Sequence, residues 1–416
     1  MIEKKYQIKS AKKYVTSLII MVLLPLTSCV AQQKELSQIE SKYIIDLDGK
    51  QVTSIPISNY FKNAKTIILE TKEDCLIGHI DELQVFDGCI FILDRLIAKS
   101  MYVFNSNGSF IGKIGSLGNG PGEYIQLIDF TLDTKNRLIY LLDYGLRIHI
   151  YHFDGSFDKT ITPLVQKSNI MRIQYNNNRL YMCVLAHNPT PDDFMLLVAD
   201  TENGKILSRF LPYKYNKGWT ESISMGHGFF VSRLNNSPLF SQMFMDYIVS
   251  IGESITPYIK LTSKNLVTEN DIKNITEVRG DRGDTPAMLG RYREYFRGKS
   301  LIYGVSSYVE NEDFILFMYR QELMNGNMVV LHKKTNSIEL GKIYMDLIFR
   351  NGDNRFFGGF AFSDTKGVYD VLNTMFIEQF KESIRNNEIV SELDKVNELL
   401  ELEDDANPVI FYYEFK

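Results

Sequence analysis

The four-residue run Phe91–Asp94 (FILD) returns in altered form as Tyr140–Asp143 (YLLD), and this repetition decides the fold. The two runs lie 49 residues apart. Each is followed by a second apolar run and then by a glycine turn, at Asn107-Gly108 and at Asp154-Gly155. Asn-Gly and Asp-Gly supply the positive φ angles that tight hairpins require. The sequence therefore contains a repeated unit of short strands joined by hairpins.

A third copy follows with the same order of features. Arg179–Met182 begins it, Phe194–Val198 continues it, and the turn at Asn203-Gly204 lies 49 residues after the turn at Gly155. Each copy is consistent with four short antiparallel strands. Units of this size are typical of propeller blades, because a lone blade exposes two apolar faces that only neighbouring blades can cover. The sequence predicts an all-β fold, a six-bladed β-propeller of four-stranded antiparallel blades with helical insertions.

Six blade-like stretches can be counted, and two further strands are expected before the first, at Tyr43–Asp48 and Thr66–Glu70. A blade that combines strands from both chain ends would close the ring and remove exposed sheet edges. We therefore expect the chain ends to meet, with Pro408–Phe415 as the outer strand of the last blade. The six stretches are residues 76–116, 122–164, 168–214, 225–262, 300–345 and 356–416.

Two segments interrupt the repeat. Residues 263–299 contain helix-like runs at Asn270–Glu277 and Ala287–Phe296. Residues 371–404 contain apolar side chains at spacings of four, three and four, which predict an amphipathic helix within a helical hairpin. Those apolar side chains belong to Ile389, Leu393, Val396 and Leu400.

The N-terminus has the order of features of a lipoprotein signal peptide. Met1–Lys13 carries five lysines and one glutamate, and Tyr14–Leu26 is almost uncharged. That apolar run is shorter than the roughly 20 residues that span a bilayer. Leu26–Cys29 (LTSC) resembles the lipobox of bacterial lipoproteins, which implies cleavage before Cys29 and lipidation of its thiol. The expected divisions are a signal peptide at 1–28, a tether at 29–40 and a propeller at 41–416.

A lipid on Cys29 would hold the protein at the membrane. Several acyl chains on one cysteine exceed the two signals that stable anchoring requires. The net charge of -5 becomes more negative without the basic leader, so no basic patch would attract anionic lipid. Val30–Leu36 has no acidic run of the kind often linked to surface export. We expect a cell-envelope protein at the outer membrane, with the periplasmic face favoured over the cell surface.

Composition excludes several classes of protein. With 44% hydrophobic and 23% charged residues, the chain can bury a large core and is not disordered overall. Its 46 basic residues do not exceed its 51 acidic ones, so nucleic acid is not an expected partner. No CxxC motif indicates a zinc ribbon. Cys75 and Cys89 would be able to pair in an oxidising compartment, or Cys89 is a small buried hydrophobe.

The segment Gly118–Tyr124 (GNGPGEY) closes the first blade and opens the second. With the lipobox, the Asn-Gly turns and Asn407–Ile410, it gives a resemblance to the six-bladed β-propeller lipoproteins of Gram-negative gut bacteria, which are similar to NHL-type propellers. The resemblance implies a funnel-shaped domain in the envelope and no established activity. The glycines and Pro121 predict a special backbone geometry. Glu123 is expected either to accept backbone N–H bonds or to line the top of the channel.

Two aspartates are the candidates for a metal site. Asp81 and Asp129 lie 48 residues apart, which predicts equivalent positions in neighbouring blades. Calcium prefers oxygen ligands that converge, so a calcium-dependent hydrolase or lactonase in the channel is one candidate function, which a calcium titration tests. The alternative is that both aspartates cap turns. His79 is a possible catalytic histidine from a separate blade, although a lone histidine is more often structural.

A binding role is the favoured function, because the sequence assembles no catalytic motif such as HExxH or GxSxG. The module would bind a peptide, a glycan or an envelope protein through the funnel mouth or the insertions. Trp219, in the loop Tyr213–Trp219, is the candidate for stacking on sugar rings if it is exposed. No cofactor is expected, and calcium would be bound only in the hydrolase or lactonase alternative.

Overall fold

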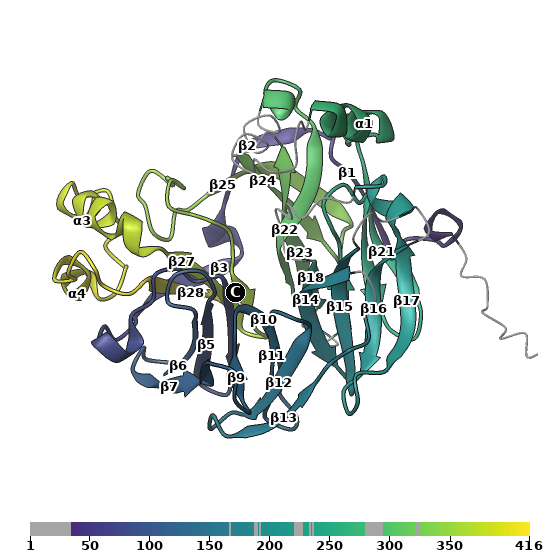
Figure 1. Ribbon diagram of the computed structural model, residues 1–416. Helices are drawn as coiled ribbons and strands as arrows, with labels where there is room; N and C mark the ends of the chain where they lie inside the picture. The colour runs from purple at the N-terminus through teal and green to yellow at the C-terminus, as the bar shows by residue number, and fades with distance from the viewer. Residues whose placement is uncertain are drawn as a thin grey trace, which may run out of the picture. The chain divides into compact units, whose positions relative to one another are not determined.

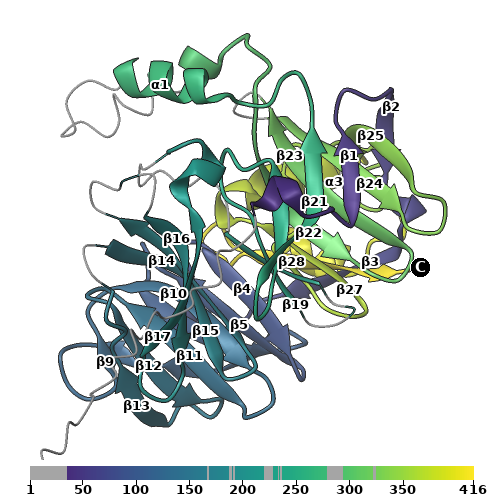
Figure 2. The ribbon, with the colours of Figure 1, turned by 90° about the vertical axis from the view of Figure 1, so that its right-hand side faces the viewer.

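The computed structural model describes residues 35–165, 168–186, 190, 193–219, 228–232, 234, 237–278, 294–321 and 325–416. The chain divides into two units, residues 1–39 and 40–416. The described part of the first unit contains one short 3-10 helix, Leu36–Gln38. The second unit consists mainly of antiparallel sheets (Figures 1 and 2). No helix in these described ranges has the length and apolar character needed to cross a membrane.

Six sheets of four or five strands form the blades of a β-propeller in residues 40–416, which confirms the predicted fold class. The innermost strands contact one another in the order β26, β4, β10, β14, β18 and β22. The first three blades follow the chain directly from inner to outer strand. They are β4 (Glu82–Phe86), β5 (Cys89–Asp94), β6 (Ser100–Asn105) and β7 (Phe110–Ile114); β10 (Leu127–Asp133), β11 (Leu138–Asp143), β12 (Arg147–His152) and β13 (Phe157–Ile161); and β14 (Ser168–Asn176), β15 (Arg179–Ala186), β16 (Phe194–Asp200) and β17 (Ile206–Pro212).

The fourth and fifth blades each gain a fifth, parallel strand from the N-terminal part of the unit. Strand β1 (Tyr43–Asp46) pairs with β21, and β2 (Gln51–Pro56) pairs with β25. The antiparallel strands of these blades are β18 (Phe229–Ser232), β19 (Ser237–Phe240), β20 (Tyr247–Ile251) and β21 (Ile255–Thr262), and β22 (Ile302–Glu310), β23 (Phe314–Gln321), β24 (Asn325–His332) and β25 (Ser337–Tyr344).

The sixth blade closes the ring with strands from both ends of the unit. It contains β26 (Phe362–Ser363), β27 (Gly367–Leu372), β28 (Val409–Phe415) and, outermost, β3 (Phe61–Ile68). The register places Val409 opposite Ile68, which confirms the expected meeting of the two ends. The strand expected at Tyr43–Asp48 takes no part in closure, and β28 is not the outermost strand. Instead, β1, β2 and β3 cover the outer edges of three successive blades.

The core lies between the blades, as the stacking argument requires. One apolar cluster joins Phe91 and Leu93 of the first blade to Phe130 and Leu141 of the second, and all four side chains are buried. Central strands such as β5 are packed on both faces, which explains why their sequences are continuously apolar. At the outer hairpin, Gly108 has a φ of +94° and a Cβ there would lie 2.0 Å from the Ile68 carbonyl oxygen. The Asn-Gly turn therefore also permits close contact between the first and last blades.

The insertions are less helical than predicted. Helix α1 (Glu269–Val278) confirms the first run, while most of Ala287–Phe296 lies outside the described residues. The helix predicted through Ile389 is wrong, because Ile389 forms an extended bridge with Phe349 and α4 is confined to Val396–Leu400. Apolar spacing misled the prediction because Ile389 and Leu393 are buried in a common core without helical geometry. The remaining short elements are α3 (Ile377–Arg385), β8 (Ser116–Leu117), β9 (Glu123–Tyr124) and the 3-10 helices Ile57–Asn59, Glu73–Cys75, Tyr213–Asn216 and Thr374–Phe376.

Candidate functional site

A cavity of about 820 Å³ lies where the hairpins between the first and second strands of several blades meet. The hairpins β4–β5, β10–β11, β14–β15 and β26–β27 all contribute residues to its wall. Its volume falls within the roughly 300–1,000 Å³ that is typical of small-molecule sites. We take this cavity, at one end of the channel, as the candidate binding site.

Polar side chains reach the cavity at alternate positions of the inner strands. Glu82 and Gln84 lie two residues apart on β4, and Gln174 and Asn176 lie two residues apart on β14. Successive side chains of a strand point to opposite sides, so each pair shares one side of its strand. The signal was present in the sequence as polar residues at period two within apolar inner strands, but sequence reasoning did not single them out.

The carboxylates of the cavity wall are already engaged. Asp133 accepts hydrogen bonds from the backbone N–H groups of Lys135 and Asn136, both at 3.1 Å. Asp364 accepts from the backbone N–H groups of Lys366 and Gly367, at 2.7 and 2.8 Å. These bonds stabilise the hairpin turns. They leave the acids as parts of the wall rather than as free ligand-binding charges.

The β14–β15 hairpin of the third blade adds amides in an unusual backbone conformation. Asn177 and Asn178 have φ angles of +48° and +59°, which place both residues in the left-handed region of a tight turn. Asn178 is held by the Tyr175 hydroxyl, which donates to its side-chain oxygen at 3.0 Å. The side chains of Asn176 and Asn177 have no hydrogen-bond partner within the part of the chain that the structure describes. These two amides are available to a ligand.

Aromatic rings form much of the remaining wall. They come from five blades, so the cavity is apolar on its sides and polar at its hairpins. Tyr175 stacks on Tyr140 with ring centroids 5.2 Å apart, which fixes the orientation of its ring. The aromatic lining residues are Phe86, Tyr175, Phe229, Phe230, Tyr308, Phe360, Phe362 and Tyr369.

The predicted pair of aspartates is not equivalent in the structure. Asp129 lies opposite Leu142, and the matching position opposite Leu93 is held by Glu82. The difference arises from a bulge between Leu127 and Asp129, which shifts the register by one residue. The spacing of 48 residues therefore identified the wrong partner.

The aspartates have structural hydrogen bonds, although the bond of Asp129 reaches a strand of the next blade and caps no turn. Asp81 accepts from the backbone N–H of Arg95 at 2.7 Å, and Asp129 accepts from that of Ile173 at 2.7 Å across the blade boundary. Burial alone would lower the pKa of Arg172, but the carboxylates of Asp129, Glu82 and Asp81 raise it. A guanidinium among these acids opposes a cation at the same place. Among the described residues, no group of three or more metal-ligating side chains is assembled, and calcium binding stays a prediction.

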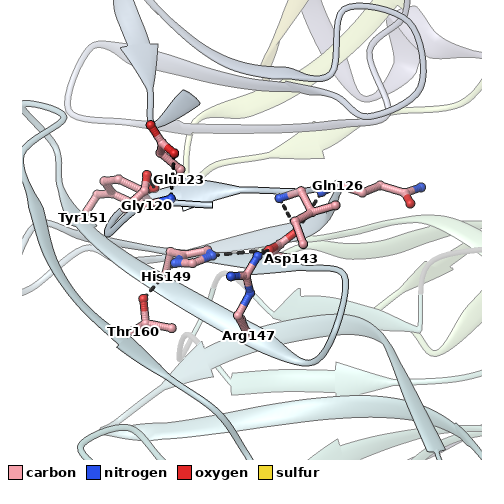
Figure 3. Close-up of polar contacts among 10 residues, drawn as sticks. Gly120, Glu123, Gln126, Asp143, Arg147, His149, Tyr151 and Thr160 are labelled. Carbon is pink, nitrogen blue, oxygen red and sulfur yellow. Dashed lines mark hydrogen bonds and ion pairs between the residues drawn. The ribbon is translucent and has the colours of Figure 1, made fainter. Parts of the chain in front are cut away.

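A different aspartate performs the repeated structural role. Asp94 accepts backbone N–H bonds from Gly78 and His79 at 2.7 and 3.0 Å. Asp143, its equivalent in the second blade, accepts from Ile125 and Gln126 at 3.1 and 2.8 Å (Figure 3). The final aspartate of each FILD-like run therefore fastens the loop that enters its own blade.

Asp143 also ends a chain of polar contacts through His149 to Thr160 (Figure 3). The Thr160 Oγ1 lies 2.8 Å from His149 Nδ1, and His149 Nε2 lies 3.4 Å from Asp143 Oδ2. Burial lowers the pKa of His149, so its neutral form is favoured even though Asp143 opposes the shift. A hydroxyl, an imidazole and a carboxylate are the parts of an activated nucleophile. None of the three lines the cavity, however, and Arg147 also binds Asp143, so we assign the group to holding β11, β12 and β13 together.

The Gly118–Tyr124 loop has the backbone role predicted for it. The Glu123 carboxylate accepts the Gly120 N–H at 2.7 Å, and a Cβ at Gly118 would lie 2.0 Å from that carboxylate (Figure 3). Gly122 has a φ of +75°, and its carbonyl accepts the Tyr151 hydroxyl. Glu123 thus follows the backbone alternative, and it is not among the residues that line the cavity.

The other predicted site residues lie apart from the cavity. His79 is exposed in the loop before β4, where its backbone N–H binds Asp94. Trp219 is only 6% exposed and packs edge-on against Phe244 at 5.1 Å, so its predicted role as an exposed sugar platform is wrong. Apolar residues of the α1 insertion cover its ring, a contact that local sequence does not reveal. Cys75 and Cys89 are free thiols, and Cys29 lies outside the described residues.

The fold and the cavity define a six-bladed β-propeller with an open polar and aromatic site in its channel. The model of the family described as a domain of unknown function, DUF4934, matches residues 42–414, and the chain belongs to this family. No curated protein matches the chain in sequence.

Two solved structures are similar in fold. A Bacteroides fragilis protein inferred to be exported has 18% identity and a TM-score of 0.68, over 90% of this chain and 99% of that one. A DUF4221 family member from Bacteroides vulgatus has 10% identity and a TM-score of 0.52, over 86% and 97% of the two chains. At these identities the similarity extends to the fold alone.

Proposed function

We propose that the chain is a binding module of the cell envelope and that its ligand occupies the channel cavity. The observation that carries this proposal is the cavity of about 820 Å³. Its wall combines aromatic rings with Asn176 and Asn177, whose side-chain amides have no partner in the described chain. Largely apolar sites with a few placed polar groups are typical of ligand pockets. The favoured alternative among enzymes, a calcium-dependent hydrolase, has less support because Arg172 lies among the carboxylates that it would use.

The envelope location rests on the leader, with lipidation at Cys29 and attachment to the periplasmic face of the outer membrane. The exported relative of similar fold is consistent with a place outside the cytoplasm. We expect Cys29→Ser to move the protein from the membrane pellet to the soluble fraction, because the lipid is the expected anchor. Cys89→Ser is the matched control and should stay in the pellet. If neither variant is released from the membrane pellet, lipid anchoring at Cys29 is contradicted.

The binding site is tested by filling the cavity. The purified full chain is incubated with an envelope extract, desalted and examined by native mass spectrometry. We expect wild-type protein to carry a bound species that Asn176→Trp loses, because an indole at this position occupies ligand space. Asn397→Trp, on the exposed face of α4, is the control and should retain the species. Equal retention by both variants, with unchanged melting temperatures, would place the ligand elsewhere.

A further inference from the structure

The charges around the cavity indicate the class of ligand. Asp133 and Asp364 are bound to backbone N–H groups, and Asp87 pairs with Arg137 at 2.5 Å. Glu82 lies close to the guanidinium of Arg172, and its interactions are likewise satisfied. Within the described chain, the buried carboxylates of the wall are therefore hydrogen-bonded, and the wall holds no buried cation. An acidic ligand would lose its hydration without gaining a buried counter-charge, which is costly. A cationic ligand would find the acceptor oxygens of Asp133 and Asp364 already engaged by backbone N–H groups.

The available polar groups are instead both donors and acceptors. A carboxamide such as that of Asn176 carries an NH₂ donor and a carbonyl acceptor side by side. Two neighbouring hydroxyls on a ring present an acceptor and a donor side by side in the same way, so one amide binds both. A trans peptide unit points its N–H and C=O in opposite directions, so one side-chain amide cannot bind both groups of the same unit. The amides therefore match vicinal hydroxyls. An extended peptide also points the N–H and C=O of one residue to the same side, so a peptide is included among the comparison probes below.

The aromatic side chains of the cavity wall also favour a sugar ligand. Phe86, Phe229 and Phe362 lie on three different blades, and each is partly exposed in the cavity wall. Flat apolar faces of this kind remove the C–H face of a ring-shaped ligand from water, which is favourable. A ligand with apolar faces and a hydroxylated edge would satisfy rings and amides at once.

From these three features we infer that the cavity binds a short, uncharged oligosaccharide. This inference rests on the proposed function, since it names the ligand class for the same site. The hydroxyl edge of the sugar meets Asn176 and Asn177 at the hairpins, and its ring faces pack on the aromatic wall. Lys135 and Lys366 are exposed at the rim, where water screens them, and they do not select for acidic ligands.

The test is isothermal titration of the full chain with named probes. The neutral probes are maltotriose, cellotriose, xylotriose, mannotriose and chitotriose, and the comparison probes are the galacturonate trimer and a capped trialanine. We expect at least one neutral trisaccharide to bind and the comparison probes not to bind. Asn176→Ala should weaken that binding about tenfold, which corresponds to the loss of about 1.4 kcal/mol of hydrogen bonding. Asn397→Ala is the matched control and should bind as wild type does.

Each other outcome overturns the inference. Binding of the acidic trimer or the peptide alone would reject the uncharged sugar while leaving the cavity as a binding site. Binding of no probe, or sugar binding that neither Asn176→Ala nor Asn176→Trp changes, would also reject it. The proposed function is judged separately, by the mass of the species retained from envelope extract, so the two can fail independently.

Discussion

Replacing Ile45 and Ile55 together with alanine is expected to remove much of the stability of the propeller. Both side chains are fully buried, Ile45 opposite Leu261 on β21 and Ile55 opposite Ile343 on β25. Truncation of a buried isoleucine to alanine costs about 2–5 kcal/mol. The two residues belong to different apolar clusters, so their effects should add to about 4–10 kcal/mol. That loss is comparable with the total stability of about 5–15 kcal/mol of a typical protein.

Chemical denaturation followed by circular dichroism measures this loss. The matched control is Ile44→Ala with Val52→Ala, on the same two strands, where the side chains are 61% and 43% exposed. Exposed substitutions of this kind usually change stability by no more than about 0.5 kcal/mol. A double variant of Ile45 and Ile55 that unfolds at the wild-type midpoint would show that β1 and β2 do not support the fourth and fifth blades.

Replacing Glu310 with glutamine is expected to cost about 3–5 kcal/mol, because it breaks a buried ion pair. The Glu310 side chain is fully buried at the end of β22 and accepts from Lys333 Nζ at 2.5 Å. It also accepts the hydroxyls of Tyr258, on the neighbouring blade, at 2.7 Å and of Tyr308 at 2.8 Å. Glutamine keeps the shape but leaves the ammonium of Lys333 without a counter-charge.

The pH dependence of this pair has a definite sign. Burial alone would raise the pKa of Glu310, but hydrogen bonds from Lys333 and Tyr258 outweigh it and lower the pKa below the ordinary value of 4.5. The unfolded chain therefore takes up the proton first as the solution is acidified. Stability from Glu310 is present above pH 4.5 and is lost as the pH falls through the folded-state pKa. Glu310→Gln should show a weaker loss of stability in this acidic range than wild type.

Two further variants test whether the loss of stability comes from the unpaired charge of Lys333. Adding Lys333→Met to Glu310→Gln should recover much of the lost stability, because no charge then remains buried without a partner. The control is Asp313→Asn, which breaks the exposed pair with Lys334 and should cost about 0–1 kcal/mol. A loss at Glu310 no larger than the loss at Asp313 would show that the buried network does not hold β21 and β22 together.

The repeat was readable because it reflects local physics. Glycine turns need positive φ angles, and strands packed on both faces need apolar residues throughout. Repeats such as FILD and YLLD therefore revealed the blades and their order along the chain. The helix through Ile389 failed for a related reason, since burial produces apolar spacing whether or not the backbone is helical. The pairing of Asp81 with Asp129 failed because a single bulge changes the register without changing the spacing noticeably.

The candidate site was less predictable than the fold. Asn176, Gln174 and Gln84 are ordinary polar residues in the sequence, and only the ring of blades brings them to one cavity. Trp219 is of a residue type that stacks on sugar rings when it is exposed, but the distant α1 segment and Phe244 bury it. Whether a side chain is exposed depends on which residues from elsewhere in the chain pack over it.

The sequence by itself determined the all-β class, the six blades and the expected leader, because these depend on residue periodicity, turn chemistry and the order of charged and apolar segments. The tertiary structure alone decided where β1 and β2 pair, which carboxylates are occupied and which amides face the cavity. Those features depend on contacts between residues tens to hundreds of positions apart, such as Ile45 with Leu261 and Glu310 with Tyr258. No local pattern encodes such contacts, because the residues meet and stabilise the protein only after the ring has closed.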